Sequence, residues 1–592
     1  MTVASRLESL RAHMQSLKLD AVWVPRADEF LGEYVPIHNE RLAYLTGFTG
    51  SAGVCVVTMD AAILFVDGRY TLQAASQSPE PLFEHQHIIE TPPEVFLRDR
   101  LSKNQVVGVD ARCLSFQSFT RIEQTLGENG ISLTAMAENA VDLIWTDRPE
   151  ASVSPIILLD EAVTGASSIQ KRTAMTQSLK KANADAVLLT QLDSIAWALN
   201  IRGDDVPHLP VLLAYAIMTR EGDFTLFTDT HKLVDGLADH VGPGFSVLPI
   251  DQFDAYLKGL SNTCARLLFD PQTCHAHSPL ICRDQGIELI PQNDPAEQLK
   301  ACKNAIEVAG IRRAHVRDGV ALCRFLAWLD GEVASGQAHD EGSVSDRLEA
   351  FRRELPELKD LSFSTISAAG PNAAMAHYSH SNGVPSPLVL NSVYLVDSGG
   401  QYLDGTTDVT RTIAIGEPSD RQKEMFTRVL KGHIALSSAR FPRGTAGNQL
   451  DVLARQFLWE IGKDYDHGTG HGVGCYLSVH EGPQRIGKTP GPTAALRPGM
   501  VVSNEPGYYE AGAYGIRCEN LLVVVETDTP MLAFEPLTLA PFDRRLILVS
   551  LLSETEKQWI DDYHAQVREQ IGGKLQGEEK EWLQSMTAPL AA

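Results

Sequence analysis

The spacing of apolar and polar positions predicts a chain built from several mixed helix and strand units. Charged amphipathic helices are expected at residues 4–17 and 169–182, each followed by short β-branched strands that alternate with further helices. The apolar run at residues 20–24 recurs at residues 185–189, and two later segments of each stretch also correspond. We therefore expect two related α/β units in the first half of the chain.

The second half has a different pattern. Residues 296–333 carry apolar positions at helical spacing and predict one long helix, which is followed mainly by strands and tight glycine turns. The segment after Glu554 is again helical and charged. Proline-bearing stretches at 147–155 and 291–295 separate the units. The predicted domains are residues 1–150, 151–296 and 297–592.

Composition narrows the class of protein. A chain of 592 residues is too long for one hydrophobic core, and its formal charge of -24 argues against a nucleic acid as partner. The sequence shows neither a secretory signal nor an apolar stretch of about 20 residues, so we expect no membrane partner. Nine scattered cysteines form no CxxC pair, which favours a reduced, cytoplasmic protein.

Two aspartates stand out in the segment VYLVDSGGQYLDGTTDVTRT, residues 393–412, which predicts two paired strands. The apolar alternation turns Asp397 and Asp408 inward. Buried carboxylates of like charge repel unless a cation neutralises them, and a metal ion is the usual cation.

Three further residues extend this candidate site. His471 lies among glycines that leave its imidazole unobstructed, Glu505 ends an apolar strand before a proline, and Glu519 interrupts another apolar strand. Four carboxylates and one imidazole form a mostly hard ligand set that suits Mn, Co or Zn. Their charge of about -4 would balance two divalent ions, and such a pair of ions indicates a hydrolase.

The order of these five residues, with the contexts DGTTDVTRT, HGTGHGVG, NEPGYY and GIRCEN, resembles the pita-bread metallopeptidases of family M24. This family includes methionine aminopeptidase, prolidase and aminopeptidase P, and the resemblance spans residues 299 to about 550. Upstream, RLAYLTGFTGSAG at Arg41, VDGRY at Val66 and VDLIWTDRP at Val141 resemble the three-domain, cytosolic type of aminopeptidase P. Prolidases have only one domain ahead of the catalytic domain, so the second unit favours the three-domain type.

The resemblance implies an α/β (α+β) protein with two creatinase-like N-terminal domains and a pita-bread catalytic domain. It implies hydrolysis of the N-terminal Xaa-Pro bond by a hydroxide that bridges two divalent metal ions, Mn²⁺ first, with Co or Zn as alternatives. Asp397 would bind one ion, His471 and Glu505 the other, and Asp408 and Glu519 both. The expected partners are peptides with proline at the second position and a second copy of the chain in a homodimer.

The resemblance also assigns residues around the metals. Glu505 would accept the proton of the attacking water, and three histidines would stabilise the oxyanion and relay protons: His377, His467 and His480. Contacts to the substrate are expected from four residues: Arg41, His377, His471 and His480. Arg517 would orient a ligand carboxylate. The wall of a proline pocket is suggested for Tyr378, His380, Tyr508 or Tyr509, although His380, like His433, is as well explained by a structural role.

Three other interpretations stay open. One is a purely structural or interaction protein, for which replacement of Asp408 by alanine would change no activity. A prolidase, which cleaves only Xaa-Pro dipeptides, would share all five ligands. A non-catalytic protein of the creatinase fold would have lost its metals, and the intact ligand set argues against it.

Overall fold

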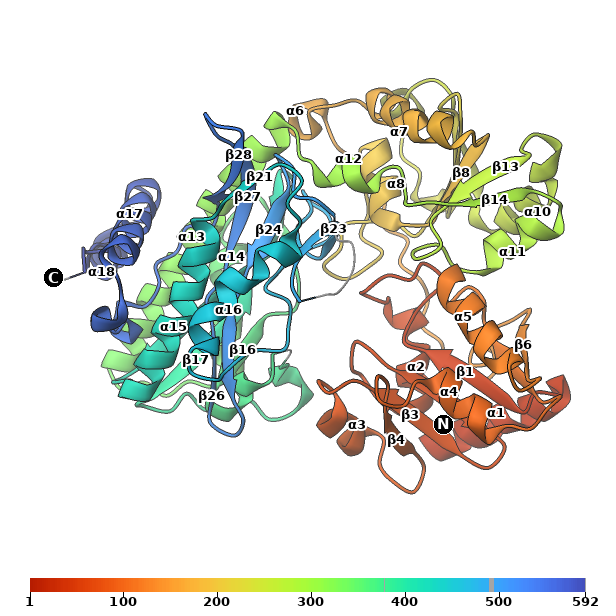
Figure 1. Ribbon diagram of the computed structural model, residues 1–592, viewed down its shortest axis with the longest axis horizontal. Coiled ribbons are helices and arrows are strands. Elements are labelled where there is room, and N and C mark those ends of the chain that lie inside the picture. The colour runs from red at the N-terminus through yellow and green to blue at the C-terminus, as the bar shows by residue number, and fades with distance from the viewer. Residues whose placement is uncertain (377, 489–493, 591–592) are drawn as a thin grey trace. The chain divides into compact units, whose positions relative to one another are not determined.

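The computed structural model describes residues 1–376, 378–488 and 494–590, with the side chain of Leu72 also left out. The chain divides into two compact units (Figure 1). The first unit comprises Met1–Leu158 and Ala166–Ala296, and the second comprises Leu159–Gly165 and Glu297–Ala592. Among the described residues, no helix combines the length and the apolar character needed to cross a bilayer.

The first unit contains two six-stranded sheets with the same strand order and the same strand directions. The first sheet has the order β4-β3-β2-β1-β5-β6, formed by Glu84–His87, Ala62–Val66, Val54–Thr58, Ala21–Pro25, Val106–Val109 and Ser132–Ala135. The second has the order β12-β11-β10-β8-β13-β14, formed by Phe245–Pro249, Phe224–Thr228, Tyr215–Thr219, Ala186–Leu189, Arg266–Phe269 and Glu288–Pro291. This agreement supports the internal duplication expected from the sequence.

The helices that open the two repeats lie where their apolar spacing places them. Helix α1 spans Val3–Leu17 and helix α7 spans Ser168–Ala182. Each is capped by a hydroxyl residue, Thr2 or Ser167, whose side chain accepts a hydrogen bond from a main-chain N–H of the first turn. Short helices α2 (Arg41–Thr46) and α8 (Leu192–Leu199) occupy the next matching positions.

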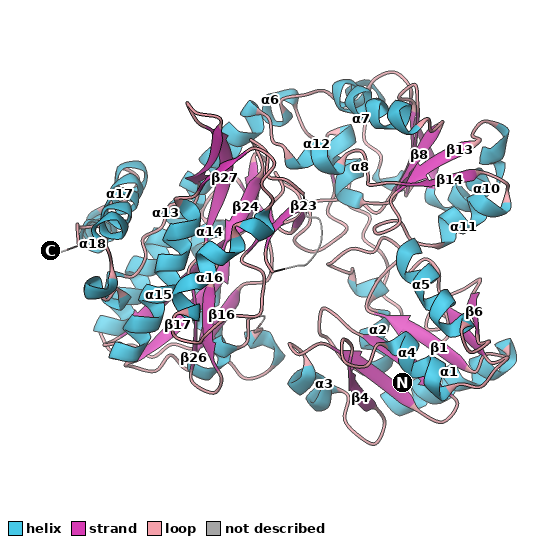
Figure 2. Cartoon of the chain, in the orientation of Figure 1, coloured by secondary structure: helices cyan, strands magenta, loops and turns pink. Residues whose placement is uncertain are grey.

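The second unit holds helices on antiparallel sheets (Figure 2). Its larger sheet has the order β21-β28-β27-β24-β22-β23, formed by Arg440–Pro442, Met531–Pro536, Asn520–Glu526, Val501–Asn504, Gly470–Gly472 and Glu481–Ile486. A three-stranded sheet has the order β16-β17-β20, formed by Ile366–Ala369, Ser392–Ser398 and Val409–Ile415. Strands β25 (Gly507–Glu510) and β26 (Tyr514–Arg517) form a hairpin.

The main helices of this unit are α13 (Ala305–Ala334), α14 (Glu341–Arg353), α15 (Asp420–Ser437), α16 (Asp451–Trp459), α17 (Glu554–Ile571) and α18 (Gly577–Met586). One apolar core joins α15, α16 and α17 to the β25–β26 hairpin through residues such as Leu430, Leu458, Ile516 and Ile560. This core supports the strands that carry the candidate ligands.

One helix prediction is wrong in detail. The expected helix at 296–333 is two helices, α12 (Glu297–Ala301) and α13. Asn304 interrupts them because its side chain accepts hydrogen bonds from the N–H groups of Ile306 and Glu307, while the Glu307 carboxylate accepts from the Asn304 N–H. The Asn304 amide also donates to the carbonyl of Thr164 at 2.8 Å, and the segment Leu159–Gly165 accordingly belongs to the second unit.

Candidate metal centre

Two strands of the small sheet carry the aspartates. Asp397 lies near the end of β17, opposite Thr410 of the antiparallel β20, and Asp408 lies directly before β20. Both side chains are buried, with 8% and 4% of their surface exposed. Between these strands the chain forms a further short hairpin, β18 (Gly400–Tyr402) and β19 (Gly405–Thr406), which belongs to another sheet. The predicted strand pair is present, and this inserted hairpin is an addition to it.

His471 lies on the short strand β22, whose glycines permit a very close approach to β24. A Cβ atom on Gly470 would lie 2.0 Å from the carbonyl oxygen of Ser503. The Nδ1 of His471 is 2.9 Å from the carbonyl oxygen of Gly472, which can only accept, so Nδ1 carries the proton. Nε2 is therefore the atom that binds a metal once its proton is lost, and it lies 3.4 Å from both Asp408 Oδ2 and Glu505 Oε1.

The two glutamates are held at strand ends. Glu505 follows β24, its N–H donates to the Thr469 carbonyl at 2.8 Å, and its Oε1 accepts from Ser503 Oγ at 2.9 Å. Glu519 lies between β26 and β27, at the corner between two sheets, and does not interrupt a single strand as expected from the sequence. Strand β26 ends before Glu519 because the chain passes there from the β25–β26 hairpin to the six-stranded sheet that contains β27. Glu519 is 1% exposed.

The ligand atoms of these residues converge. One atom each from Asp408, His471 and Glu519 lies within 4.8 Å of the others. Burial raises the pKa of Asp397 to about 7, with Arg517 opposing the shift and Asp408 and Glu505 adding to it. Burial, together with the charges of Asp408, Asp397 and Glu505, raises the pKa of Glu519 well above its ordinary value. The carboxylates thus share one low-dielectric region and repel one another.

The site fits divalent cations. Oδ1 of Asp397 is buried and has no hydrogen-bond partner among the described residues, which is costly unless a cation binds it. Burial alone would lower the pKa of His471, but the hydrogen bond to Asp408 and the charge of Glu505 raise that pKa to about 9. A protonated imidazole thereby compensates part of the negative charge, and metal binding would release its proton. Two divalent ions would balance the four carboxylates.

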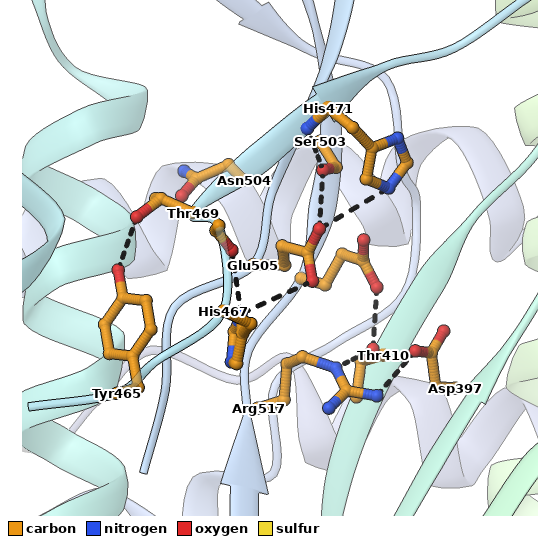
Figure 3. Close-up of polar contacts among 12 residues, drawn as sticks. Asp397, Thr410, Tyr465, His467, Thr469, His471, Ser503, Asn504, Glu505 and Arg517 are labelled. Atoms are coloured by element: carbon orange, nitrogen blue, oxygen red, sulfur yellow. Dashed lines mark hydrogen bonds and ion pairs between the residues drawn. The ribbon is translucent and has the colours of Figure 1, made fainter. Parts of the chain in front are cut away.

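Arg517 makes an ion pair with a candidate ligand carboxylate, as the sequence suggested. Its Nη2 donates to Asp397 Oδ2 at 2.6 Å, and its Nε donates to Thr410 Oγ1 at 3.0 Å (Figure 3). Thr410 Oγ1 in turn donates to Glu519 Oε2 at 2.6 Å. Sequence reasoning missed Thr410, although it follows Asp408 by two residues and a strand places such residues on one face.

His467 and His480 both lie beside the cluster. Nδ1 of His467 donates to the Gly468 carbonyl at 2.7 Å and lies 4.0 Å from Glu505 Oε2. Its Nε2 therefore accepts from the Tyr509 hydroxyl at 2.7 Å. Figure 3 shows His467 and His471 reaching Glu505 from different sides. The exposed His480 places its ring edge-on against the His471 ring, with centroids 4.4 Å apart.

Of the other residues predicted from the sequence, some lie at the candidate site and others have partners elsewhere. His377 falls outside the described residues. Of the suggested pocket wall, Tyr509 lies at the site, where its hydroxyl accepts from Arg517 Nη1 and donates to His467 Nε2, whereas Tyr378 donates to Glu341 at 2.7 Å. Tyr508 donates to Glu510 and His380 is half-buried. The contact of His433 Nδ1 with the Asn504 carbonyl at 3.0 Å agrees with a structural role.

Arg41 lies in the first unit and is 5% exposed. Its guanidinium donates to both oxygens of Asp142, at 2.7 and 2.9 Å, and to Glu29 at 3.2 Å. The substrate contact expected of Arg41 stays a prediction.

Comparison with known families places this site in a wider group of proteins. Residues 309–526 match the model of metallopeptidase family M24, and residues 530–590 match that of its C-terminal region. Residues 6–142 and 147–307 each match a creatinase/prolidase N-terminal domain. Together these matches confirm the expected fold class, two creatinase-like domains ahead of a pita-bread domain.

The chain also matches individual proteins. It is 39% identical over 613 residues to a probable Xaa-Pro aminopeptidase P of Laccaria bicolor, covering all of this chain and 94% of that protein. The crystal structure of an X-prolyl aminopeptidase from Caenorhabditis elegans, described as a cytosolic enzyme with a di-nuclear active site, is 34% identical with a TM-score of 0.93 and full coverage of both chains. An Xaa-Pro dipeptidase from Bacillus anthracis is 25% identical with a TM-score of 0.51, covering 64% of this chain and 99% of its own.

Proposed function

Because this chain belongs to metallopeptidase family M24, we propose that it is a metal-dependent aminopeptidase that removes the N-terminal residue from peptides with proline in second position. The observation that carries the proposal is the convergence of buried carboxylates with His471, in a chain that matches Xaa-Pro aminopeptidases from end to end. A buried group of like charges is expensive to maintain, and a pair of catalytic cations explains it.

Five residues would hold the two ions: Asp397, Asp408, His471, Glu505 and Glu519. Bound ions of this kind supply a nucleophilic water at neutral pH and polarise the carbonyl under attack. Arg517 fixes the orientation of Asp397, and Thr410 fixes that of Glu519. These contacts leave the remaining carboxylate oxygens to face the site.

Proton transfer is assigned to the residues that border the ligands. Glu505 accepts the proton of the attacking water. His467 lies within 4.0 Å of Glu505 and is held by the Tyr509 hydroxyl, so it can pass a proton toward the leaving proline nitrogen. His480, exposed beside His471, is placed to donate a hydrogen bond to the oxyanion, and His377 keeps the same predicted role.

A bond to proline differs from other peptide bonds because its nitrogen carries no hydrogen and the ring fixes φ. We assign Tyr509 to the wall of a pocket for such a ring, because its hydroxyl contacts His467 and Arg517 beside the candidate ligands. Preference for peptides longer than dipeptides is favoured because the dipeptidase structure has a counterpart for only 64% of this chain, whereas the X-prolyl aminopeptidase covers all of it.

Three finer assignments belong to the same proposal. Manganese is the expected metal, since four of the five ligands are hard carboxylates. A cytoplasmic location is favoured by nine free cysteines, because disulfides are rare in that compartment. We further propose a homodimer.

The deciding experiment is an activity panel on the metal-stripped full chain. Mn²⁺, Co²⁺ or Zn²⁺ is added back, and Xaa-Pro-Xaa, Xaa-Ala-Xaa and Xaa-Pro peptides are compared. Release of the first residue from Xaa-Pro-Xaa alone, dependent on added metal, is the expected result. Cleavage restricted to the dipeptide would make the protein a prolidase, and no metal-dependent cleavage of any peptide would leave the non-catalytic alternative.

A further inference from the structure

A buried arginine lies on the face of β20 opposite the metal ligands. Arg411 is 2% exposed and follows Thr410, so its side chain points away from the side that carries Asp408 and Thr410. The five N–H groups of its guanidinium lie within hydrogen-bonding distance of six acceptors among the described residues, Thr410 O, Glu519 O, Asn520 Oδ1, Ala540 O, Pro541 O and Tyr563 Oη, and Nη2 shares its two hydrogens among three of them. None of these acceptors is a carboxylate.

These contacts join three separate parts of the chain. Nη1 reaches the main-chain oxygens of Thr410 at 2.9 Å and Glu519 at 2.6 Å, which flank the metal cluster. Nη2 and Nε reach the main-chain oxygens of Ala540 at 2.6 Å and Pro541 at 3.0 Å, in the C-terminal region. Because the N–H groups of a guanidinium lie in one plane, Arg411 holds these main-chain oxygens at fixed positions relative to one another.

Tyr563 extends the network to helix α17. Its hydroxyl accepts from Arg411 at 3.0 Å and lies 2.9 Å from the Ala540 carbonyl, to which it can donate. The Tyr563 ring is 3% exposed and stacks on Trp559 with centroids 5.3 Å apart. Tyr563 therefore links helix α17 to the arginine by a hydrogen bond. Figure 1 shows α17 beside α13 in the second unit, called the catalytic unit below because it carries the candidate metal centre.

Glu519 is thereby fixed at two points. Its carboxylate accepts from Thr410 Oγ1, while its main-chain oxygen accepts from Arg411. Its own N–H donates to the Thr410 carbonyl at 3.3 Å. A side chain can offer a metal a fixed oxygen only if its backbone is also fixed, so loss of the Arg411 contact would loosen the ligand without touching its carboxylate.

We propose that Arg411 and Tyr563 form a buried latch through which helix α17 positions Glu519 and so sets the metal affinity of the site. The inference rests on the proposed function only in taking Glu519 as a metal ligand. Arg411 and Tyr563 are positioning residues that touch neither substrate nor metal.

The test measures binding of Mn²⁺ alone to the metal-stripped full chain, by competition with a fluorescent chelator. Arg411→Lys keeps the positive charge but removes the planar set of N–H donors. We expect it to raise the dissociation constant for Mn²⁺ about 10-fold. Tyr563→Phe removes only the hydroxyl, and we expect about a threefold rise. If Arg411→Lys shows no cooperative melting transition, the Tyr563→Phe result decides.

Tyr394→Phe is the matched control. Its hydroxyl is also buried in the catalytic unit, on β17, and lies 2.6 Å from Ser367 Oγ. This variant should lower the melting temperature as Tyr563→Phe does but bind Mn²⁺ like the wild type. Wild-type binding by both latch variants, or equal weakening by the control, overturns the latch alone. A wild-type protein that binds no Mn²⁺ overturns the proposed function and the latch with it.

Discussion

The buried ion pair between α13 and α14 permits a quantitative prediction. Asp318 and Arg352 are 3% and 0% exposed. The guanidinium donates from Nε to Oδ1 at 2.8 Å and from Nη2 to Oδ2 at 3.0 Å, and the Tyr402 hydroxyl donates to the same Oδ1 at 2.8 Å. Arg352→Met keeps most of the apolar stem but leaves the Asp318 carboxylate buried without its cation.

Removing one partner of a buried pair costs about 3–5 kcal/mol. The catalytic unit has about 300 residues, so at about 2.1 cal/mol/K per residue its entropy of unfolding is about 0.6 kcal/mol/K. The melting temperature of this unit should therefore fall by about 5–8 °C. Replacing both partners, in Asp318→Asn with Arg352→Met, should recover at least about half of that loss because no unpaired charge remains.

The effect also depends on pH. Burial alone would raise the pKa of Asp318, but the charge and hydrogen bonds of Arg352 and the Tyr402 hydroxyl hold that pKa below its ordinary value. The stabilisation is then complete above the unfolded pKa of about 3.9 and is lost as pH falls through the lower folded value. Between pH 7 and pH 5 the wild-type pair stays charged, whereas in the variant burial without Arg352 raises the pKa of the Asp318 carboxyl and favours its protonation as the pH falls. The difference in melting temperature should narrow over this range.

Differential scanning calorimetry with chelator present measures these differences without a contribution from bound metal. A separate scan with added Mn²⁺ identifies the transition of the catalytic unit, because bound metal raises the melting temperature of that unit. A melting temperature unchanged by Arg352→Met at pH 7 would refute the argument. So would a double variant less stable than the single one.

Three further predictions concern the metal centre. Asp408→Ala should abolish release of the first residue from an Xaa-Pro-Xaa peptide and lower the metal content measured by elemental analysis; full activity would contradict its role as a ligand. Thr410→Val should weaken Mn²⁺ binding by about 10- to 100-fold because the hydroxyl that orients Glu519 is lost, and Thr410→Ser should restore it. Dialysis against a chelator should stop hydrolysis, and Mn²⁺ should restore it; activity indifferent to the chelator would exclude a metal mechanism.

Much of the fold follows from local patterns. The expected helices at 4–17 and 169–182 agree with α1 and α7 to within one residue, because apolar spacing and capping residues act over a few positions. The apolar periodicity of residues 296–333 runs through Asn304 and so predicts one helix, whereas the capping-box spacing of Asn304 and Glu307 marks the start of a new one. The association of Leu159–Gly165 with the second unit depends on a contact between Thr164 and Asn304, which no local pattern predicts.

The residues of the candidate site also differ in whether the local sequence reveals them. Carboxylates within apolar strands can be recognised from sequence, because burial of such a charge needs an explanation. Their partners cannot be recognised in this way: Ser503, Thr410 and Tyr509 are ordinary strand residues until the register brings them beside Glu505, Glu519 and His467.

Strand β20 contributes both to the candidate metal centre and to the buried contacts that hold its backbone. Asp408, directly before the strand, and Thr410 and Thr412 within it alternate with Val409 and Arg411, so the first three face the candidate metal centre and Arg517 and the other two face the protein interior. A substitution at Asp408 or Thr410 removes a ligand or its direct hydrogen bond. A substitution at Arg411 acts only through the backbone, because its contacts end on main-chain oxygens, an amide and a phenol. Substitutions at Asp408 or Thr410 and substitutions at Arg411 should therefore both lower the metal affinity. Only the loss caused at Arg411 should also be produced by the remote substitution Tyr563→Phe on α17.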